Sequence, residues 1–332
     1  MKNLWKASAL LVLLLGLATS YAAGQFINEF DLQSTTSFPE GLTFDPVSAN
    51  FFPTAVFGAQ ITRVPLDARA PESVFFTETA NPQISFLGAK VDFIHRTLWV
   101  CGIDLVTNPF PVSFVYGITI PPNNQAGQLA HRIALPQPSF CNDIALDFRG
   151  DIFATDSVQP NIYRIHPEND SFEIFATNPL FAAKGGPFGL NGIQVTPDQR
   201  HILTVTTFPP QVLTLPIDEP TNVQLVNLSG DPLTDTTQPF RFFGPDGLIF
   251  VFDKAYIVQN GVVQQLTFTS FDFLNATLKN DTQITTGLSS ATDAFGQLYV
   301  IDSQVVPVLD LHQAPVFPFK ILRVDREVFE NQ

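Results

Sequence analysis

The sequence predicts an all-β protein, a six-bladed β-propeller with four-stranded antiparallel blades. The chain is rich in Phe, Val, Ile and Thr, turn residues recur every few positions, and no segment longer than about ten residues shows apolar residues at helical spacing. One hairpin pattern also returns six times. The steps between its repeats, 51, 51, 49, 55 and 46 residues, are close to the period of about 40 to 50 residues in known propellers.

The repeat is clearest in the stretch CNDIALDFRGDIFATDS, which begins at Cys141. Its first half alternates as a strand does, R-G-D makes a turn, and the second half runs back, so two short antiparallel strands follow a polar entrance. Aligned on their turns, the six repeats place one residue at the head of each inner strand. These predicted heads are Glu40, Val91, Asn142, Asn191, Asp246 and Thr292.

The two ends of the chain are expected to close the ring. A strand within residues 25–32 is predicted to pair with the final FPFKILRVD, because closure protects the sheet edges that an open propeller would expose. A two-sheet sandwich with a second domain is the alternative architecture. It explains the regular return of one segment less well.

The first 24 residues have the pattern of a secretory signal peptide. Lys2 and Lys6 precede an apolar run over residues 7–18, and small residues follow at 22–24. The run is shorter than the roughly 20 residues that cross a bilayer, and no later segment is long and apolar enough. We therefore expect a secreted protein whose residues 25–332 form a single propeller domain.

Two further features fit an extracellular protein. Four Asn-X-Ser/Thr triplets, at Asn169, Asn227, Asn275 and Asn280, are candidate glycosylation sites. The two cysteines, Cys101 and Cys141, form either one disulfide or two buried thiols.

The formal net charge of −14 disfavours nucleic acid and anionic membranes as partners. It attracts cations instead. We expect a monomer that acts on a small molecule.

Polar residues are unusual at the heads of strands. In a propeller these heads meet in space, because the inner strands line one central tunnel. Glu40, Asn142, Asn191 and Asp246 are all oxygen donors. Two carboxylates and two amide oxygens suit Ca²⁺ best among divalent cations, with Mg²⁺, Mn²⁺ or Zn²⁺ as alternatives. A cation at the mouth of the tunnel would explain why Asn142 and Asp143 open a strand. Each residue alone is also a common turn former or cap.

The quoted motifs resemble a known family. FPEGLTFDP, NDIALDFRGDIFATDS, LNGIQVTPD, PDGL and ATDAFGQLYVIDSQ are similar to segments of the six-bladed propellers that include regucalcin, gluconolactonases, diisopropyl fluorophosphatase and, more distantly, the paraoxonases. The resemblance covers nearly all of residues 25–332. It implies a Ca²⁺ held by Glu40, Asn142, Asn191 and Asp246, with Asp246 as catalytic base or nucleophile and Asn142 contacting the substrate.

The chain departs from this family at three points. The five histidines do not form the pair that paraoxonases use as a base, no substrate arginine is recognisable, and Gly41 follows Glu40 where paraoxonases have a Glu-Asp pair. No GxSxG, HExxH or phosphate-binding glycine loop occurs either.

These observations leave two main hypotheses. In the first, the protein is a secreted Ca²⁺-dependent hydrolase of a lactone or related ester. In the second, it is a non-catalytic propeller with a structural ion that binds a protein or a small ligand. A condensing enzyme similar to strictosidine synthase shares the fold, but it does not need this ligand set.

Overall fold

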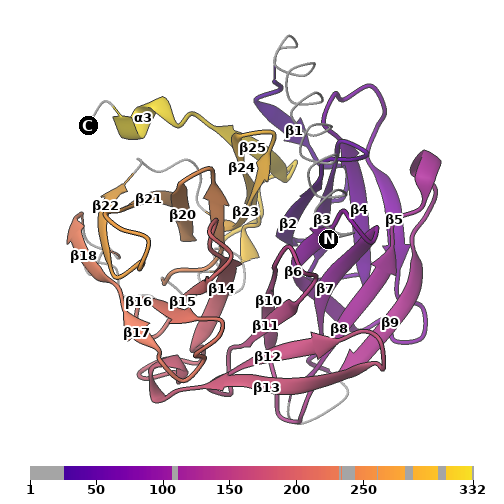
Figure 1. Ribbon diagram of the computed structural model, residues 1–332. Helices are drawn as coiled ribbons and strands as arrows, with labels where there is room; N and C mark the ends of the chain where they lie inside the picture. The colour runs from indigo at the N-terminus through magenta and orange to yellow at the C-terminus, as the bar shows by residue number, and fades with distance from the viewer. Residues whose placement is uncertain are drawn as a thin grey trace, which may run out of the picture.

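Six sheets follow one another around a common axis in the computed structural model (Figure 1). The structure describes residues 26–106, 111–231, 233, 244–259, 261–280, 287–305 and 312–330. The predicted signal peptide, residues 1–24, lies outside them. The six-bladed propeller expected from the repeats is confirmed.

In the first four blades the chain starts at the innermost strand and proceeds outward. In the fifth and sixth blades the outermost strand comes from an earlier part of the chain. The first three blades contain β2 (Pro39–Asp45), β3 (Asn50–Ala55), β4 (Gln60–Pro65) and β5 (Ser73–Thr77); β6 (Ile84–Asp92), β7 (Thr97–Asp104), β8 (Val112–Thr119) and β9 (Gln128–Ala134); and β10 (Cys141–Leu146), β11 (Ile152–Asp156), β12 (Asn161–His166) and β13 (Ser171–Thr177).

The other three blades follow in the same direction around the ring. They contain β14 (Leu190–Val195), β15 (His201–Thr206), β16 (Gln211–Pro216) and β17 (Gln224–Leu225); β19 (Leu248–Val251), β20 (Lys254–Gln259), β21 (Val262–Phe268), β22 (Asn275–Asn280) and β18 (Asn227–Gly230); and β23 (Leu288–Ala294), β24 (Gln297–Asp302), β25 (Lys320–Val324) and β1 (Glu29–Asp31).

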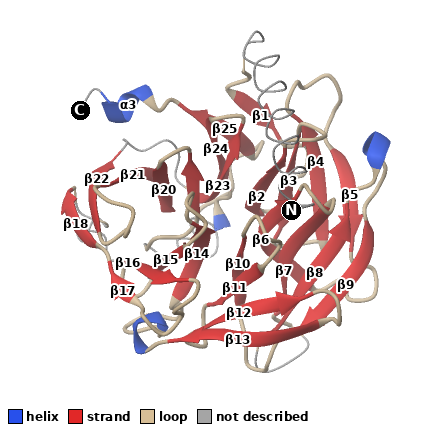
Figure 2. Cartoon of the chain, viewed as in Figure 1, coloured by secondary structure: helices blue, strands red, loops and turns tan. Residues whose placement is uncertain are grey.

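Helices contribute little to the described part of the chain (Figure 2). The helices whose bounds lie within the described residues are the short 3-10 turns η1 (Pro122–Asn124) and η2 (Pro179–Phe181) and the single turn of α3 (Glu327–Glu330). Among the described residues, no helix has the length and hydropathy needed to cross a bilayer.

The ring closes as the sequence predicted. β1 pairs with β25 in antiparallel register, so the first described strand completes the sixth blade. Phe30 opposes Ile321 and packs on Phe51 and Tyr299, with ring centroids 5.4 and 6.2 Å away. The N-terminal strand thereby joins the last blade to the first.

The fifth blade has the expected four antiparallel strands, β19 to β22, and one additional strand at its edge. After the two-residue β17, the chain leaves the fourth blade and runs along the outer edge of the fifth. There β18 pairs with β22 in parallel, with Asn227 opposite Asn275. Val226, between β17 and β18, is buried in the apolar cluster that the two blades share. Burial of this side chain ties the crossing segment to the interface.

The apolar core consists of six clusters, and each lies between two neighbouring blades. Between the first and second blades, for example, Phe52 and Ile61 pack with Phe86 and Val100, all fully buried. Alternate side chains of a strand point to opposite faces of its sheet. Each blade therefore contributes one face to the cluster before it and the other to the cluster after it.

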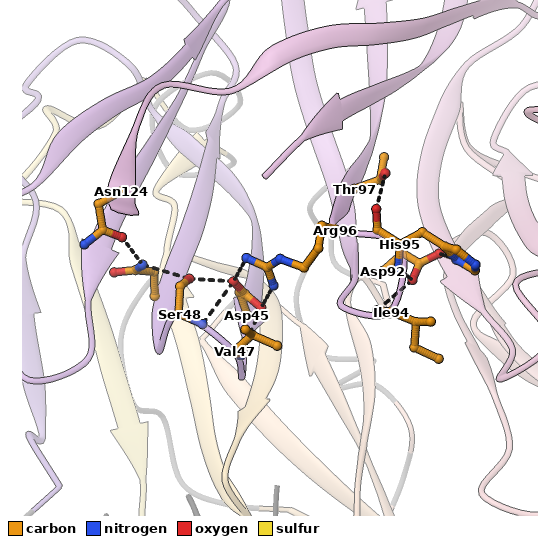
Figure 3. A network of polar contacts seen from close by, with 10 residues as sticks. Asp45, Val47, Ser48, Asp92, Ile94, His95, Arg96, Thr97 and Asn124 are labelled. Carbon is orange, nitrogen blue, oxygen red and sulfur yellow. Dashed lines mark hydrogen bonds and ion pairs between the residues drawn. The ribbon is translucent and has the colours of Figure 1, made fainter. Parts of the chain in front are cut away.

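Polar and covalent links add to this packing. The guanidinium of Arg96, in the β6–β7 turn, donates two hydrogen bonds of 2.7 and 2.8 Å to the buried carboxylate of Asp45, at the end of β2 (Figure 3). Cys101 on β7 and Cys141 on β10 form a disulfide with a Cα–Cα distance of 5.3 Å. The second blade is thus tied to the first by an ion pair and to the third by a covalent bond.

Ring closure gives a first prediction. Replacing Phe30, which is 6% exposed, with alanine should lower the free energy of unfolding by about 3–5 kcal/mol, because the substitution leaves a cavity between the last and first blades. The measurement is equilibrium unfolding in urea. Glu29→Ala on the same strand, which removes an exposed ion pair with Lys320, should cost less than about 1 kcal/mol. Equal losses for the two variants would contradict a closure held by apolar packing.

Candidate functional site

All four oxygen-bearing heads that the sequence analysis selected line one cavity of about 260 Å³ at one end of the inner strands. Glu40 comes from β2, Asn142 from β10, Asn191 from β14, and Asp246 directly precedes β19. Residues as far apart in sequence as Glu40 and Asp246 therefore share one site.

The other two heads differ from those predicted. Leu87 and Ser289 line the cavity, whereas Val91 and Thr292, the positions chosen from the sequence, lie further along their strands and are buried. The assignment failed because these two blades carry no Asn, Asp or Glu at the head, where Leu87 and Ser289 stand. In the second blade, the glycine after the head would have located it, since Leu87-Gly88 matches Glu40-Gly41.

A bulge shapes the heads. The pairing of the inner strand with the next strand shifts at the head in the first four blades and in the sixth, which leaves one or two residues there outside the regular register. Such a bulge redirects side chains that would otherwise alternate between the faces of the sheet. This is how a side chain at the edge of a blade comes to point into the cavity.

The glycine after the head allows neighbouring heads to touch. A Cβ atom on Gly41 would lie 2.3 Å from the carbonyl oxygen of Leu87, and one on Gly192 would lie 2.4 Å from that of Asp246. Both distances are too short for any side chain. Gly192 instead donates a 2.9 Å hydrogen bond to the carbonyl of Asp246. The bulge of the first blade thus contacts the head of the second, and the bulge of the fourth contacts the head of the fifth.

Asp143 stands where four of the other five blades have this glycine. Its carboxylate accepts a 2.8 Å hydrogen bond from the N–H of Ile144 and a 3.2 Å bond from the N–H of Ile193 in the next blade. The side chain therefore joins the third blade to the fourth. This contact accounts for the second residue of the unusual Asn142-Asp143 pair.

The two asparagine side chains are held by hydroxyl groups. Asn142 Nδ2 donates to Ser157 Oγ at 3.0 Å, and that hydroxyl donates to the carbonyl of Leu190 at 2.6 Å. Because a hydroxyl has one proton, Ser157 can only accept from Asn142. The amide nitrogen of Asn142 is therefore fixed, and its carbonyl oxygen is the end left available to a ligand in the cavity.

The same arrangement recurs one blade later. Asn191 Nδ2 donates to Thr207 Oγ1 at 3.0 Å, and Thr207 Oγ1 donates to the carbonyl of Pro245 at 3.0 Å. Sequence reasoning missed Ser157 and Thr207. Both directly follow the second strand of their blade, in the sequences T-D-S and T-V-T-T.

The two carboxylates repel each other in a poorly solvated place. Burial, and then the negative charges of Asp246 and Asp143, raise the pKa of Glu40 well above its usual range. Burial also raises the pKa of Asp246 to about 7, although a hydrogen bond with Asn191 lowers it. In addition, Glu40 Oε2 is buried without a hydrogen-bond partner. A cation beside these groups would reduce the repulsion between the carboxylates, offset the cost of their burial and give Glu40 Oε2 a partner.

The donor set fits a hard divalent cation. It offers two carboxylates and two oriented amide oxygens, all of which are oxygen ligands of the kind that Ca²⁺ prefers. Within the described ranges, no group of three or more His, Cys, Asp and Glu side chains could hold a metal. A site here would therefore depend on the amides as well as on the carboxylates.

Above this polar floor the cavity wall is apolar. The lining residues of that kind are Val56, Leu87, Ile103, Leu105, Phe140, Phe188, Leu288 and Val305. Hydroxyl groups of Ser85, Thr207, Ser289 and Ser303 lie among them. An uncharged ligand with an apolar part and one polar group would match this lining.

Three of the candidate glycosylation sites are exposed at the surface. Asn169 lies in a turn, and Asn227 and Asn275 lie on β18 and β22, the two outermost strands of the fifth blade. The side chain of Asn280 is half-buried and accepts a hydrogen bond from Gln264. Thr282 of its triplet lies outside the described residues.

Comparisons with known proteins support the fold alone. No model of a known protein family and no curated protein sequence matches the chain. Among solved structures, it is similar to the major allergen Mala s 1 of Malassezia sympodialis, with 11% identity, a TM-score of 0.71, and coverage of 91% of this chain and 97% of the allergen.

Two enzymes of known structure are also similar to the chain. One is a gluconolactonase from Xanthomonas campestris, with 13% identity, a TM-score of 0.58 and 89% of both chains covered. The other is a PQQ-bound aldose sugar dehydrogenase from Streptomyces coelicolor, with 12% identity, a TM-score of 0.58, and coverage of 89% of this chain and 97% of that one. At these identities the likeness is one of fold.

The buried carboxylates predict how stability depends on pH. Because the pKa of Asp246 rises from its ordinary 3.8 to about 7 on folding, the native state holds a proton that the unfolded chain releases. In chelator, the free energy of unfolding should therefore fall as the pH rises from 3.8 to about 7. Near the upper end of this pH range, Ca²⁺ should restore it.

The measurement is urea unfolding at about pH 5 and about pH 8, with EDTA or with CaCl₂. Asp246→Asn should show a smaller fall in chelator. An identical pH dependence in the variant and in the wild type would mean that ionisation of Asp246 does not cause the loss of stability.

Proposed function

We propose that this protein is a secreted, divalent-cation-dependent hydrolase of a lactone or related ester. Glu40, Asn142, Asn191 and Asp246 would hold the ion, with Ca²⁺ as the first candidate and Mg²⁺, Mn²⁺ or Zn²⁺ as alternatives. The observation that carries the proposal is the convergence of these four oxygen donors on the floor of one cavity, with Glu40 Oε2 buried and unpartnered.

Each residue has a role in this proposal. When bound, the ion would polarise the carbonyl of the substrate. Asp246 would be the base or nucleophile, as the family resemblance implies, and its carboxylate lines the cavity beside the other three donors. Asn142 would direct its carbonyl oxygen to the ion and contact the substrate, while the hydrogen bond to Ser157 keeps its amide nitrogen turned away. The apolar wall would position the rest of the substrate.

A non-catalytic binding protein is the second candidate, and the lining favours it in one respect. No histidine, lysine or arginine is among the described residues that line the cavity, so a carboxylate would have to provide all the acid–base chemistry. In that case the ion is structural and the apolar wall binds a small ligand.

Extracellular location belongs to the same proposal. The predicted leader, the exposed glycosylation triplets and the Cys101–Cys141 disulfide support it. Expression in a secreting host, followed by mass spectrometry of the medium, would test the leader and the modified asparagines together.

Turnover distinguishes the two candidates. With aliphatic and sugar lactones, aryl esters and organophosphates, we expect hydrolysis of at least one class, lost with chelator and reduced about 10²-fold or more in Asp246→Asn. Asp253→Asn is the matched control, because that side chain is 83% exposed in the same blade, and it should keep full activity.

The remaining outcomes are equally informative. Turnover that survives both the chelator and Asp246→Asn would refute the catalytic role. No turnover with any substrate, together with a Tm that rises with Ca²⁺, would favour the binding protein.

The orientation of Asn191 gives a separate prediction. Thr207→Val removes the hydroxyl that fixes this amide, so the affinity for Ca²⁺ should fall about 10- to 100-fold, as measured by titration calorimetry. Thr214→Val is the matched control in the same blade, because the Thr214 hydroxyl is buried without a partner. Equal affinities for the two variants would show that the amide is not oriented by Thr207.

A further inference from the structure

Two phenylalanines line the cavity on the side of the two amides. Phe140 and Phe188 come from neighbouring blades, and their ring centroids are 4.9 Å apart. In sequence, Phe140 lies two residues before Asn142, and Phe188 lies three residues before Asn191. Because both rings are only half-buried and line the cavity, part of each ring remains open to a ligand.

One residue holds this aromatic pair in a fixed relation to the amide of Asn142. Ser157 N–H donates a 2.8 Å hydrogen bond to the carbonyl of Phe140. The carbonyl of Ser157 accepts a 2.7 Å bond from Gly189 N–H, the residue after Phe188. The hydroxyl of Ser157 accepts from Asn142. A ligand held at the floor beside Asn142 would therefore have its remaining atoms against these two rings.

The rest of the wall offers few hydroxyl groups that can donate to a ligand. Thr207 Oγ1 already donates to the carbonyl of Pro245 at 3.0 Å, and Ser289 Oγ donates to the carbonyl of Glu40 at 2.6 Å. Since a hydroxyl has one proton, neither can also donate to a ligand. Among the described residues that line the cavity, the hydroxyls of Ser85 and Ser303 remain as donors.

Such a wall discriminates between ligands by their substituents. A hydroxyl group that leaves water without finding a partner weakens binding by about 10- to 100-fold. An alkyl or aryl group gains affinity from the same transfer. A sugar lactone carries several hydroxyl groups and would leave most of them unpaired here, whereas an alkyl-substituted lactone carries none.

We propose that the ligand of this cavity is a lactone or ester with an alkyl or aryl substituent and no free hydroxyl group, and that Phe140 and Phe188 select it. That this ligand is a substrate rests on the proposed function, whereas the preference for an apolar substituent rests on the wall alone. The chain thus discriminates against sugar lactones, although the proteins of similar fold include a gluconolactonase.

The test compares three lactones that share a six-membered ring and differ in their substituents. δ-Valerolactone has none, δ-decalactone has a pentyl chain, and glucono-δ-lactone has hydroxyl groups. With kcat/KM taken relative to the spontaneous hydrolysis of each lactone, wild type should favour δ-decalactone about 10-fold or more over δ-valerolactone and about 10²-fold or more over glucono-δ-lactone. Equal values for δ-decalactone and either of the other two would overturn the inference and leave the proposed hydrolase standing.

Alanine variants test whether the aromatic pair is responsible. Phe140→Ala and Phe188→Ala should each lose most of the preference for δ-decalactone through a higher KM, while kcat/KM for δ-valerolactone changes less than about 3-fold. Phe172→Ala is the matched control, because this half-buried ring packs on Tyr163 in the third blade and is not among the lining residues. It should keep the wild-type ratios. The same ratios in all three variants would contradict selection by the pair, and the wild-type ratios decide if neither cavity variant folds.

Binding measured without turnover separates this inference from the proposed function. If no substrate is hydrolysed, the proposed function fails, and saturation-transfer NMR shows which of the three lactones binds. Transfer to the pentyl chain of δ-decalactone that is lost in Phe188→Ala, with none to glucono-δ-lactone, would support the inference. It would be overturned by the absence of transfer to the chain, by equal transfer to both lactones, or by transfer that Phe188→Ala leaves unchanged.

Discussion

Face-to-face packing of neighbouring blades is the constraint on which the rest of this structure depends. No blade has a core of its own, because its two faces contribute to two different apolar clusters. Six clusters therefore require six blades in a closed circle, and the pairing of β1 with β25 satisfies the last of them. The positions of the heads on the axis follow from that circle.

The polar centre is placed by apolar contacts. Oxygen atoms that repel one another, such as those of Glu40 and Asp246, stay close because their strands are held from behind by buried side chains. Bulges and the glycines after the heads let the inner strands come near enough for this. Where aspartate replaces glycine, at Asp143, the side chain makes the link to the next blade itself. Packing energy thus maintains an arrangement that is electrostatically unfavourable without a cation.

The repeat, the blade number, the closure and the four oxygen-bearing heads could all be predicted from the sequence, since each depends on local patterns of turns and alternation. The heads Leu87 and Ser289 could not, because alternation alone does not show where a bulge shifts the register by one or two residues. Ser157 and Thr207 act through backbone carbonyls of the next blade, and no local pattern reports such contacts. Lys90 is similar. A lysine in a strand is usually a surface residue, and only the closed ring shows that the Lys90 ammonium reaches Gln194 in the fourth blade.

The strand that runs from the fourth blade to the edge of the fifth has a consequence for how the chain can be divided. β18 precedes β19 in sequence but belongs to the far side of the same sheet, parallel to β22. A cut made between these two repeats would leave β22 with a bare edge and β18 without a neighbour. This propeller is therefore not a string of interchangeable modules, and a shortened or rearranged ring would have to keep the fourth and fifth repeats together.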